Sequence, residues 1–205
     1  MTTTRTSTIA TAAIYSGFPE VVEQTINLNF LSACESLMKS PVFTKIHAMT
    51  DVTNGGLRGD AFEMAETASC RIVIDEAAIG SLVEPHVRSM LEKLRIDYLG
   101  VSLDSLLVVA PESAADAICS AVGAAGVKMH RVGHVEKGKP EAVLVIDGHE
   151  HDFSPRFRES AYTPVKKVAD VEARDFEEMK RGVLRASEAA IEKKQRVLAR
   201  LKVGK

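Results

Sequence analysis

Apolar and polar positions change their period several times along this chain of 205 residues. From Val42 to Met49 they alternate, as in a half-buried strand, and after Gly56 the apolar residues recur every three or four positions, as on one face of a helix. The same analysis predicts strands at 42–50, 71–76, 105–110, 127–136 and 141–147, and helices at 57–69, 84–95 and 112–124. Because strands and helices alternate, we expect the helices to pack against a sheet.

The segments before and after this region show different sequence patterns. Residues 1–18 are rich in Thr and Ser, which predicts a flexible start or a strand that needs a partner. Pro19 suits the first position of a helix that extends to about Lys39, and Asp147-Gly148 predicts a turn into a short last strand ending near Phe153. We therefore divide the chain into a start (1–18), a central domain (19–153) and a C-terminal appendage (154–205).

The appendage combines a basic linker with a charged helix. Residues 154–169 contain two prolines and predict an extended segment. From about 171 to 201, Phe176, Met179, Val183 and Ala186 begin a narrow apolar stripe on an otherwise charged helix. Two interpretations stay open: the helix lies over its own domain with its charges solvated, or it pairs with another subunit.

The residues with the clearest chemical implication form the junction between the first predicted strand and the next helix. Two glycines, Gly55 and Gly56, let the backbone turn tightly and approach a ligand, and the free N–H groups of a first helical turn favour an anion such as phosphate. Asp51, Thr53 and Asn54 add side-chain acceptors and donors beside the turn. These five residues are the candidate phosphate- or substrate-binding site, and a plain strand–turn–helix junction capped by Asn54 is the alternative.

Several segments together resemble one known family. They are Asp51-Val52-Thr53-Asn54-Gly55-Gly56-Leu57, Glu63-Met64-Ala65-Glu66, Cys70-Arg71-Ile72-Val73-Ile74-Asp75-Glu76, Ser105-Leu106-Leu107-Val108-Val109-Ala110-Pro111-Glu112 and Val132-Gly133-His134-Val135. In this order, over about residues 42–147, they resemble the C-terminal domain shared by aminoimidazole ribonucleotide (AIR) synthetase, the hydrogenase-maturation carbamoyl dehydratase, selenophosphate synthetase and thiamine monophosphate kinase. The dehydratase and the AIR synthase-related proteins resemble this chain most.

The resemblance implies an α+β fold, a layered α/β sandwich with a mixed sheet, to which this chain adds the long C-terminal helix. It also implies half of an ATP-dependent enzyme, because members of the family bind ATP and magnesium chiefly through an N-terminal domain. Only about forty residues precede the first predicted strand, so we expect this chain alone to bind neither cofactor and to be inactive. The dehydratase branch ends in a reactive cysteine, whereas this chain ends Arg200-Leu201-Lys202-Val203-Gly204-Lys205.

Composition narrows the possible partners. A formal net charge of -2 and the absence of Trp give no reason to expect nucleic acid or an acidic membrane surface. The widely spaced Cys34, Cys70 and Cys119 suit buried thiols in a reducing cytoplasm, where we expect the protein to reside. His149-Glu150-His151 would place two histidines on one strand face, but beside a turn such polar residues are ordinary, and we predict no metal site.

Two functional hypotheses follow. In the first, the chain is the substrate side of an AIR synthase-related enzyme, either cut from a longer protein or a subunit that meets its ATP-binding half in trans. Its substrate would be a small phosphorylated or amide-bearing molecule. In the second, it is a non-catalytic module for ligand binding or assembly that forms oligomers, a homodimer among them.

Overall fold

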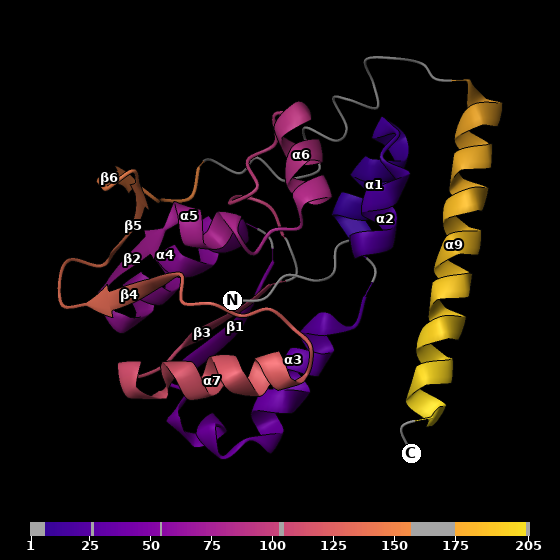
Figure 1. Ribbon diagram of the computed structural model, residues 1–205. Coiled ribbons are helices and arrows are strands. Elements are labelled where there is room, and N and C mark those ends of the chain that lie inside the picture. The colour runs from indigo at the N-terminus through magenta and orange to yellow at the C-terminus, as the bar shows by residue number, and fades with distance from the viewer. Residues whose placement is uncertain (1–6, 26, 54, 103–104, 157–174, 204–205) are drawn as a thin grey trace.

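The computed structural model describes residues 7–25, 27–53, 55–102, 105–156 and 175–203 (Figure 1). Its strands form two sheets. A two-stranded antiparallel sheet pairs β1 (Ala48–Val52) with β3 (Ser105–Val109). A four-stranded sheet has the order β4 (Gly133–Glu136), β2 (Arg71–Asp75), β5 (Glu141–Ile146) and β6 (His149–Asp152). This sheet is mixed, because β2 and β5 are parallel whereas β2–β4 and β5–β6 are antiparallel.

Helices surround both sheets and complete the α+β architecture that was predicted. In chain order they are α1 (Ser7–Ser16), α2 (Pro19–Thr25), α3 (Asn29–Lys39), the 3-10 helix η1 (Pro41–Lys45), α4 (Gly56–Ala68), α5 (Glu76–Gly80), α6 (Pro85–Lys93), α7 (Glu112–Ala124) and α9 (Phe176–Val203). The predicted fold class, a mixed sheet layered with helices and followed by a long C-terminal helix, is confirmed.

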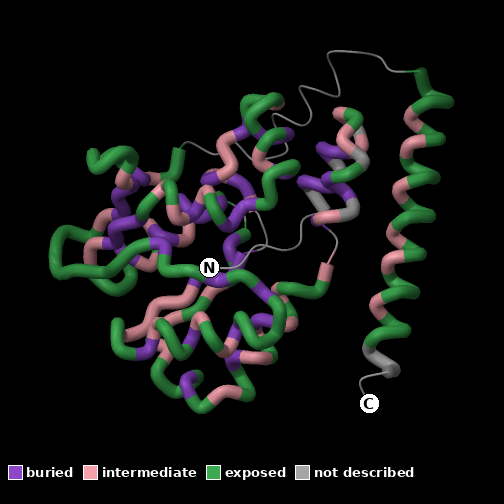
Figure 2. The backbone as a smooth tube through the Cα atoms, in the orientation of Figure 1, coloured by how far each residue is buried: buried purple, intermediate pink, exposed green. Residues whose placement is uncertain are grey.

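The buried side chains form two clusters (Figure 2). The larger cluster joins the four-stranded sheet to α1, α2, α4 and α6, and its fully buried members include Leu57, Met90 and Phe153. The smaller cluster lies where α3 and α7 pack together against β3, around Leu37 and Val122. The two-stranded sheet contributes to both clusters, because Val52 and Leu107 lie in the larger cluster and Leu106 lies in the smaller one.

The start of the chain differs from the prediction. Instead of a flexible segment or a strand, residues 7–16 form α1, because Ile9, Ala12 and Ala13 are buried in the larger cluster. Because α1 is rich in small and hydroxyl-bearing residues, its buried face gives no clear apolar period in the sequence. Residues 1–6 lie outside the described part of the chain.

The predicted helix over 19–39 begins at Pro19 as expected but is divided into α2 and α3. Asn27 accounts for the break: its side-chain amide donates to the carbonyl of Gln24 at 2.9 Å, and its side-chain oxygen accepts from the N–H of Asn29 at 2.9 Å. Asn competes in this way with the helical hydrogen bonds of the backbone.

Two of the predicted elements need correction, and one short helix was not predicted. The strand over 42–50 is wrong in its first half, where Ser40 accepts a hydrogen bond from the N–H of Val42 and η1 forms after it. The strand over 127–136 is limited to β4. The short helix α5 was not predicted; the side chain of Asp75 caps it by accepting from the N–H groups of Ala77 and Ala78.

The turn at Asp147-Gly148 is confirmed. Both residues have positive φ, 50° and 78°, and they join β5 to β6 as an antiparallel hairpin. Such angles match the twist of the flanking strands, and Asp-Gly adopts them readily.

The long helix α9 runs beside α1 and α2 (Figure 1). Its half-buried residues Met179, Ala186 and Val197 share one side, and Ala186 packs against the larger cluster. Over its described length α9 thus covers its own domain, while Leu184 and Ile191 stay more than half exposed. None of the described helices has both the length and the apolar character needed to cross a membrane.

Arg71 on β2 binds a carboxylate from each of the other strands of its sheet. Its guanidinium pairs with Glu136 of β4, with Glu141 of β5 at 2.8 Å and with Glu150 of β6 at 2.6 Å. Arg71 lowers the pKa of Glu150 through a side-chain hydrogen bond. One cation therefore ties together all four strands at this end of the sheet.

We expect Arg71→Gln to lower the melting temperature at pH 7 by several degrees, because three carboxylates would then face one another without a cation. The stabilisation from the lowered pKa of Glu150 is present above the ordinary Glu value and is lost as the pH falls, so the deficit should shrink near pH 4. Lys39→Gln, which breaks only an exposed pair with Glu35 on α3, is the control. Equal effects of the two substitutions in a thermal melt would contradict this role of Arg71.

Candidate functional site

The glycine turn that the sequence predicted lies between β1 and α4. Gly55 occupies the N-cap position with φ 99°, and Gly56 follows with φ 64°. Both angles are in the range that favours glycine. Asp51, Thr53 and Gly55 are exposed and Gly56 is buried; Asn54 lies outside the described residues.

Gly56 is buried because α4 starts directly against the loop that follows α6. A Cβ on Gly56 would lie 2.6 Å from the carbonyl carbon of Gly100 and 2.6 Å from the nitrogen of Val101. The N–H of Arg58 donates to the carbonyl of Leu99 at 3.1 Å. Gly56 is thus required by close backbone packing as well as by its φ angle.

The first N–H groups of α4 are largely engaged within the chain. The N–H of Gly56 donates to the carbonyl of Thr53 at 3.0 Å, and that of Gly59 donates to Gly55 at 3.1 Å. Together with the bond from Arg58 to Leu99, these interactions use donors that the sequence analysis assigned to an anion. The surface that remains for a ligand is the exposed part of the turn, Thr53 and Gly55.

A buried arginine fixes the position of the turn. Arg58 is only 5% exposed; its guanidinium donates to Asp97 at 3.1 Å and lies 4.6 Å from the centre of the Phe153 ring. Asp97 also accepts from the N–H of Leu99 at 3.0 Å. Arg58 therefore joins α4, the loop after α6 and the residue that follows β6.

An acidic side chain that the sequence analysis did not single out lies one turn into α4. Burial raises the pKa of Asp60 to about 6, the nearby carboxylates of Glu63 and Asp51 add to the increase, and a backbone hydrogen bond from Thr53 opposes it. The Oδ2 atom of Asp60 is buried and has no hydrogen-bond partner among the described residues. Such an atom is costly to leave unsatisfied.

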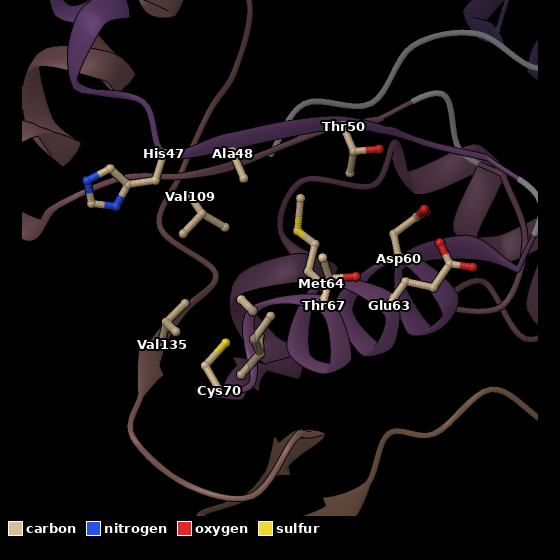
Figure 3. A pocket seen from close by; sticks show the side chains of 12 residues that line it. His47, Ala48, Thr50, Asp60, Glu63, Met64, Thr67, Cys70, Val109 and Val135 are labelled. Atoms are coloured by element: carbon tan, nitrogen blue, oxygen red, sulfur yellow. The ribbon is translucent and has the colours of Figure 1, made fainter.

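Asp60 lies at one end of a cavity of about 470 Å³ between β1 and α4 (Figure 3). Its wall is mainly apolar, from Ala48, Met64, Ala68, Ile72, Val109 and Val135. Polar side chains gather toward the ends: Thr50, Asp60 and Glu63 at one end of the view and His47 at the other, with Thr67 and Cys70 between them. The glycine turn and this cavity share the side of α4 that faces β1.

The other candidate residues have structural surroundings. Glu150 of the His149-Glu150-His151 triplet pairs with Arg71. His47 lies just before β1, where its backbone N–H donates to Val109, and His134 lies on β4 near Glu136. The three cysteines are free and half-buried. Within the described ranges, no three His, Cys, Asp or Glu side chains come close enough to hold a metal ion.

Asp60 and Glu63 were missed although one signal pointed to them. They are three positions apart on α4, as are Met64 and Thr67, so the four side chains lie near one another on the helix. The sequence did not reveal the opposite wall of the cavity. That wall includes Thr50 and Val109, which come from two strands whose pairing is not evident from periodicity.

The fold and the turn define a mixed-sheet α+β domain with a glycine-bearing strand–turn–helix junction at its surface. The family model of the AIR synthase related protein, C-terminal domain, matches residues 12–146. The chain belongs to this family. The resemblance noted in the sequence is thereby confirmed, and the match begins well before the first of the quoted motifs.

Two curated relatives give the scale of the similarity. Uncharacterized protein MJ1416 of Methanocaldococcus jannaschii is 48% identical over 196 residues, which cover 95% of this chain and 42% of the relative. Carbamoyl dehydratase HypE of Rhodobacter capsulatus is 39% identical over 80 residues, covering 38% of this chain and 23% of the relative. This chain therefore spans well under half the length of the relatives that it matches.

Solved structures of the hydrogenase maturation protein HypE share the fold. The E. coli structure has a TM-score of 0.53 at 24% identity and covers 62% of this chain and 39% of that chain. HypE in complex with ATP has a TM-score of 0.50 at 22% identity and covers 56% and 37%. The HypE–HypF complex has a TM-score of 0.51 at 21% identity and covers 58% and 39%.

We expect Gly56→Ala to destabilise the fold by about 3 kcal/mol, since a left-handed φ and a clash with the backbone of Gly100 and Val101 act together. Gly55→Ala is the matched control: its φ is also positive, but the nearest atom to an added Cβ is 3.6 Å away, so the loss should be about 1 kcal/mol. Urea unfolding of the two variants measures the difference. A smaller loss for Gly56→Ala than for Gly55→Ala would contradict the packing described here.

Asp60→Asn should stabilise the protein at pH 7.5. The pKa of Asp60 is raised in the folded state, so the folded protein binds this proton more tightly and stability falls as the pH rises from about 4 through about 6. After allowance for the partial exposure of this side chain, the gain should be about 1 kcal/mol. Urea unfolding at pH 7.5 and pH 4.5 tests this: the gain should shrink at pH 4.5, and a pH-independent gain would show that Asp60 does not titrate as described.

Proposed function

We propose that this chain is the substrate side of an AIR synthase-related, ATP-dependent enzyme of the HypE type. Membership of the family and the HypE-like fold support this proposal. A solved HypE structure contains ATP, and the chain spans 42% of the relative MJ1416. The ATP-binding half is then contributed by another segment of a longer protein or by a separate subunit.

The observation that carries the proposal is the rigid support of an exposed turn. Thr53 and Gly55 are open to solvent, whereas Gly56 and Arg58 behind them are locked against the loop after α6. A preorganised turn holds its donors in place for a ligand with little further loss of entropy. We assign it to a phosphate or an amide group of a small substrate.

Within this site the roles differ from residue to residue. The Thr53 hydroxyl and the backbone of Gly55 contact the substrate, with Asn54 between them in sequence. Gly56 positions the turn, since its own N–H is bonded to Thr53. Asp51 orients the turn or accepts a substrate proton. No side chain is assigned as the catalytic acid or base, and the chain alone is not expected to hydrolyse ATP.

The partner would close the site from the solvent side of the turn. HypE forms a complex with HypF in a solved structure, so a protein with this fold assembles with another chain. For this chain we propose the ATP-binding half as the partner, with a homodimer as a further possibility.

Pyrophosphate, with and without magnesium, should raise the melting temperature of the chain, because a ligand that binds only the folded state stabilises it. Thr53→Val should reduce the shift by more than half, whereas Thr44→Val, at an exposed position on η1, should leave it unchanged. Absence of any shift, or equal shifts in both variants, would contradict a phosphate site at the turn. ATPase activity that survives Thr53→Val would contradict the half-enzyme assignment.

A second candidate function, an assembly module, is favoured by α9. Its residues Phe176, Val183, Leu184, Ile191 and Leu198 are between 47% and 68% exposed, although all are large and apolar. Exposed apolar residues that follow one helix are typical of a surface for another protein.

If a second copy of the chain covers α9, sedimentation should show a dimer that Leu184→Ser with Ile191→Ser converts to a monomer. Ala189→Ser, at an exposed small residue of the same helix, should leave the dimer intact. If the wild-type chain stays monomeric at high concentration, the proposal that it assembles into an oligomer is wrong.

A further inference from the structure

The cavity between β1 and α4 has the size of a ligand site. Its volume of about 470 Å³ falls within the roughly 300–1,000 Å³ that is usual for small-molecule pockets. Figure 3 shows α4 and Cys70 along one side and β1 with Val109 along the other. The cavity lies beside the glycine turn but is formed by different residues.

The apolar side chains that line the cavity favour a ligand with an apolar body. Met64, Ile72 and Val109 face the space, and Val135 at its edge is 43% exposed. An apolar group placed here would remove this surface from water.

The carboxylates at one end of the cavity favour a ligand that also carries a cationic group. Asp60 and Glu63 bring two carboxylates beside the hydroxyl of Thr50, and Asp60 Oδ2 is buried without a partner among the described residues. None of the described residues that line the cavity is a lysine or an arginine, so the described lining offers these carboxylates no strong cation. A ligand that donates hydrogen bonds and carries positive charge would satisfy them.

We infer that this cavity binds a small molecule with an apolar body that ends in an amine or amidine group. The cationic end is held by Asp60 and Glu63, and the body lies between Met64 and Val109. The inference depends on the cavity and not on the proposed partnership with an ATP-binding half. It also gives the two adjacent sites opposite preferences: an anionic or amide group at the turn and a cationic group in the cavity.

Benzamidine is the probe that tests this inference, with benzoate as its anionic counterpart of similar shape. We expect calorimetric titration of the full chain to show binding of benzamidine but not of benzoate. Asp60→Asn, which keeps the shape of the side chain, should weaken benzamidine about tenfold or more, because a charge-assisted hydrogen bond is lost. Asp116→Asn, at an exposed position on α7 outside the cavity, should have no effect.

Cys70 supplies a second measurement that does not depend on the Asp60 variant. In a chain with Cys34→Ala and Cys119→Ala, iodoacetamide reports on Cys70 alone, and saturating benzamidine should slow the alkylation several-fold while benzoate does not. Equal binding of the two probes, no effect of Asp60→Asn, or no protection of Cys70 would each overturn the inference. Because neither probe contains phosphate, a negative result here leaves the phosphate test at Thr53 to be decided separately.

Discussion

The approach of α4 to the loop at residues 97–101 is the constraint on which the rest of this domain depends. Gly56 has no Cβ, so the start of α4 can lie directly against the backbone of Gly100 and Val101. Arg58, two residues further along α4, is then buried between Asp97 and the ring of Phe153. The loop after α6, the end of β6 and the beginning of α4 meet at this single place, and the hydroxyl of Ser102 extends the contact to the carbonyl of Val52 on β1.

This contact divides the glycine turn into two functional parts. The inner part, Gly56 and the N–H groups near it, is engaged in holding the domain together. The outer part, Thr53 and Gly55, stays exposed on a rigid support. The two adjacent glycines therefore differ in the structure: Gly56 is required by packing, whereas Gly55 is exposed. Beyond the turn, Asp60 connects it to the cavity, because a backbone hydrogen bond from Thr53 reaches its carboxylate.

The sequence was informative where the signal was local. The strand–turn–helix junction and the Asp147-Gly148 hairpin follow from residues that are near one another in the chain, whereas the mixed sheet was expected only from the family resemblance. The errors came from tertiary contacts and caps: α1 forms because Ile9 and Ala13 reach the larger core, and η1 replaces a strand after the Ser40 cap. The cavity was not predictable for the same reason, since the wall opposite α4 comes from β1 and β3, two strands far apart in the sequence that pair with each other.

The central claim is that the exposed side of the turn is a ligand site and not only turn geometry. A titration of the ¹⁵N-labelled chain with pyrophosphate, followed in amide correlation spectra, tests it most directly. The account predicts that the amide signals of Thr53 and Gly55 move in a saturable way, while those of Gly126 and Gly148, exposed glycines with positive φ on other turns, stay in place. Signals of all four residues moving alike, or none of them moving, would contradict it.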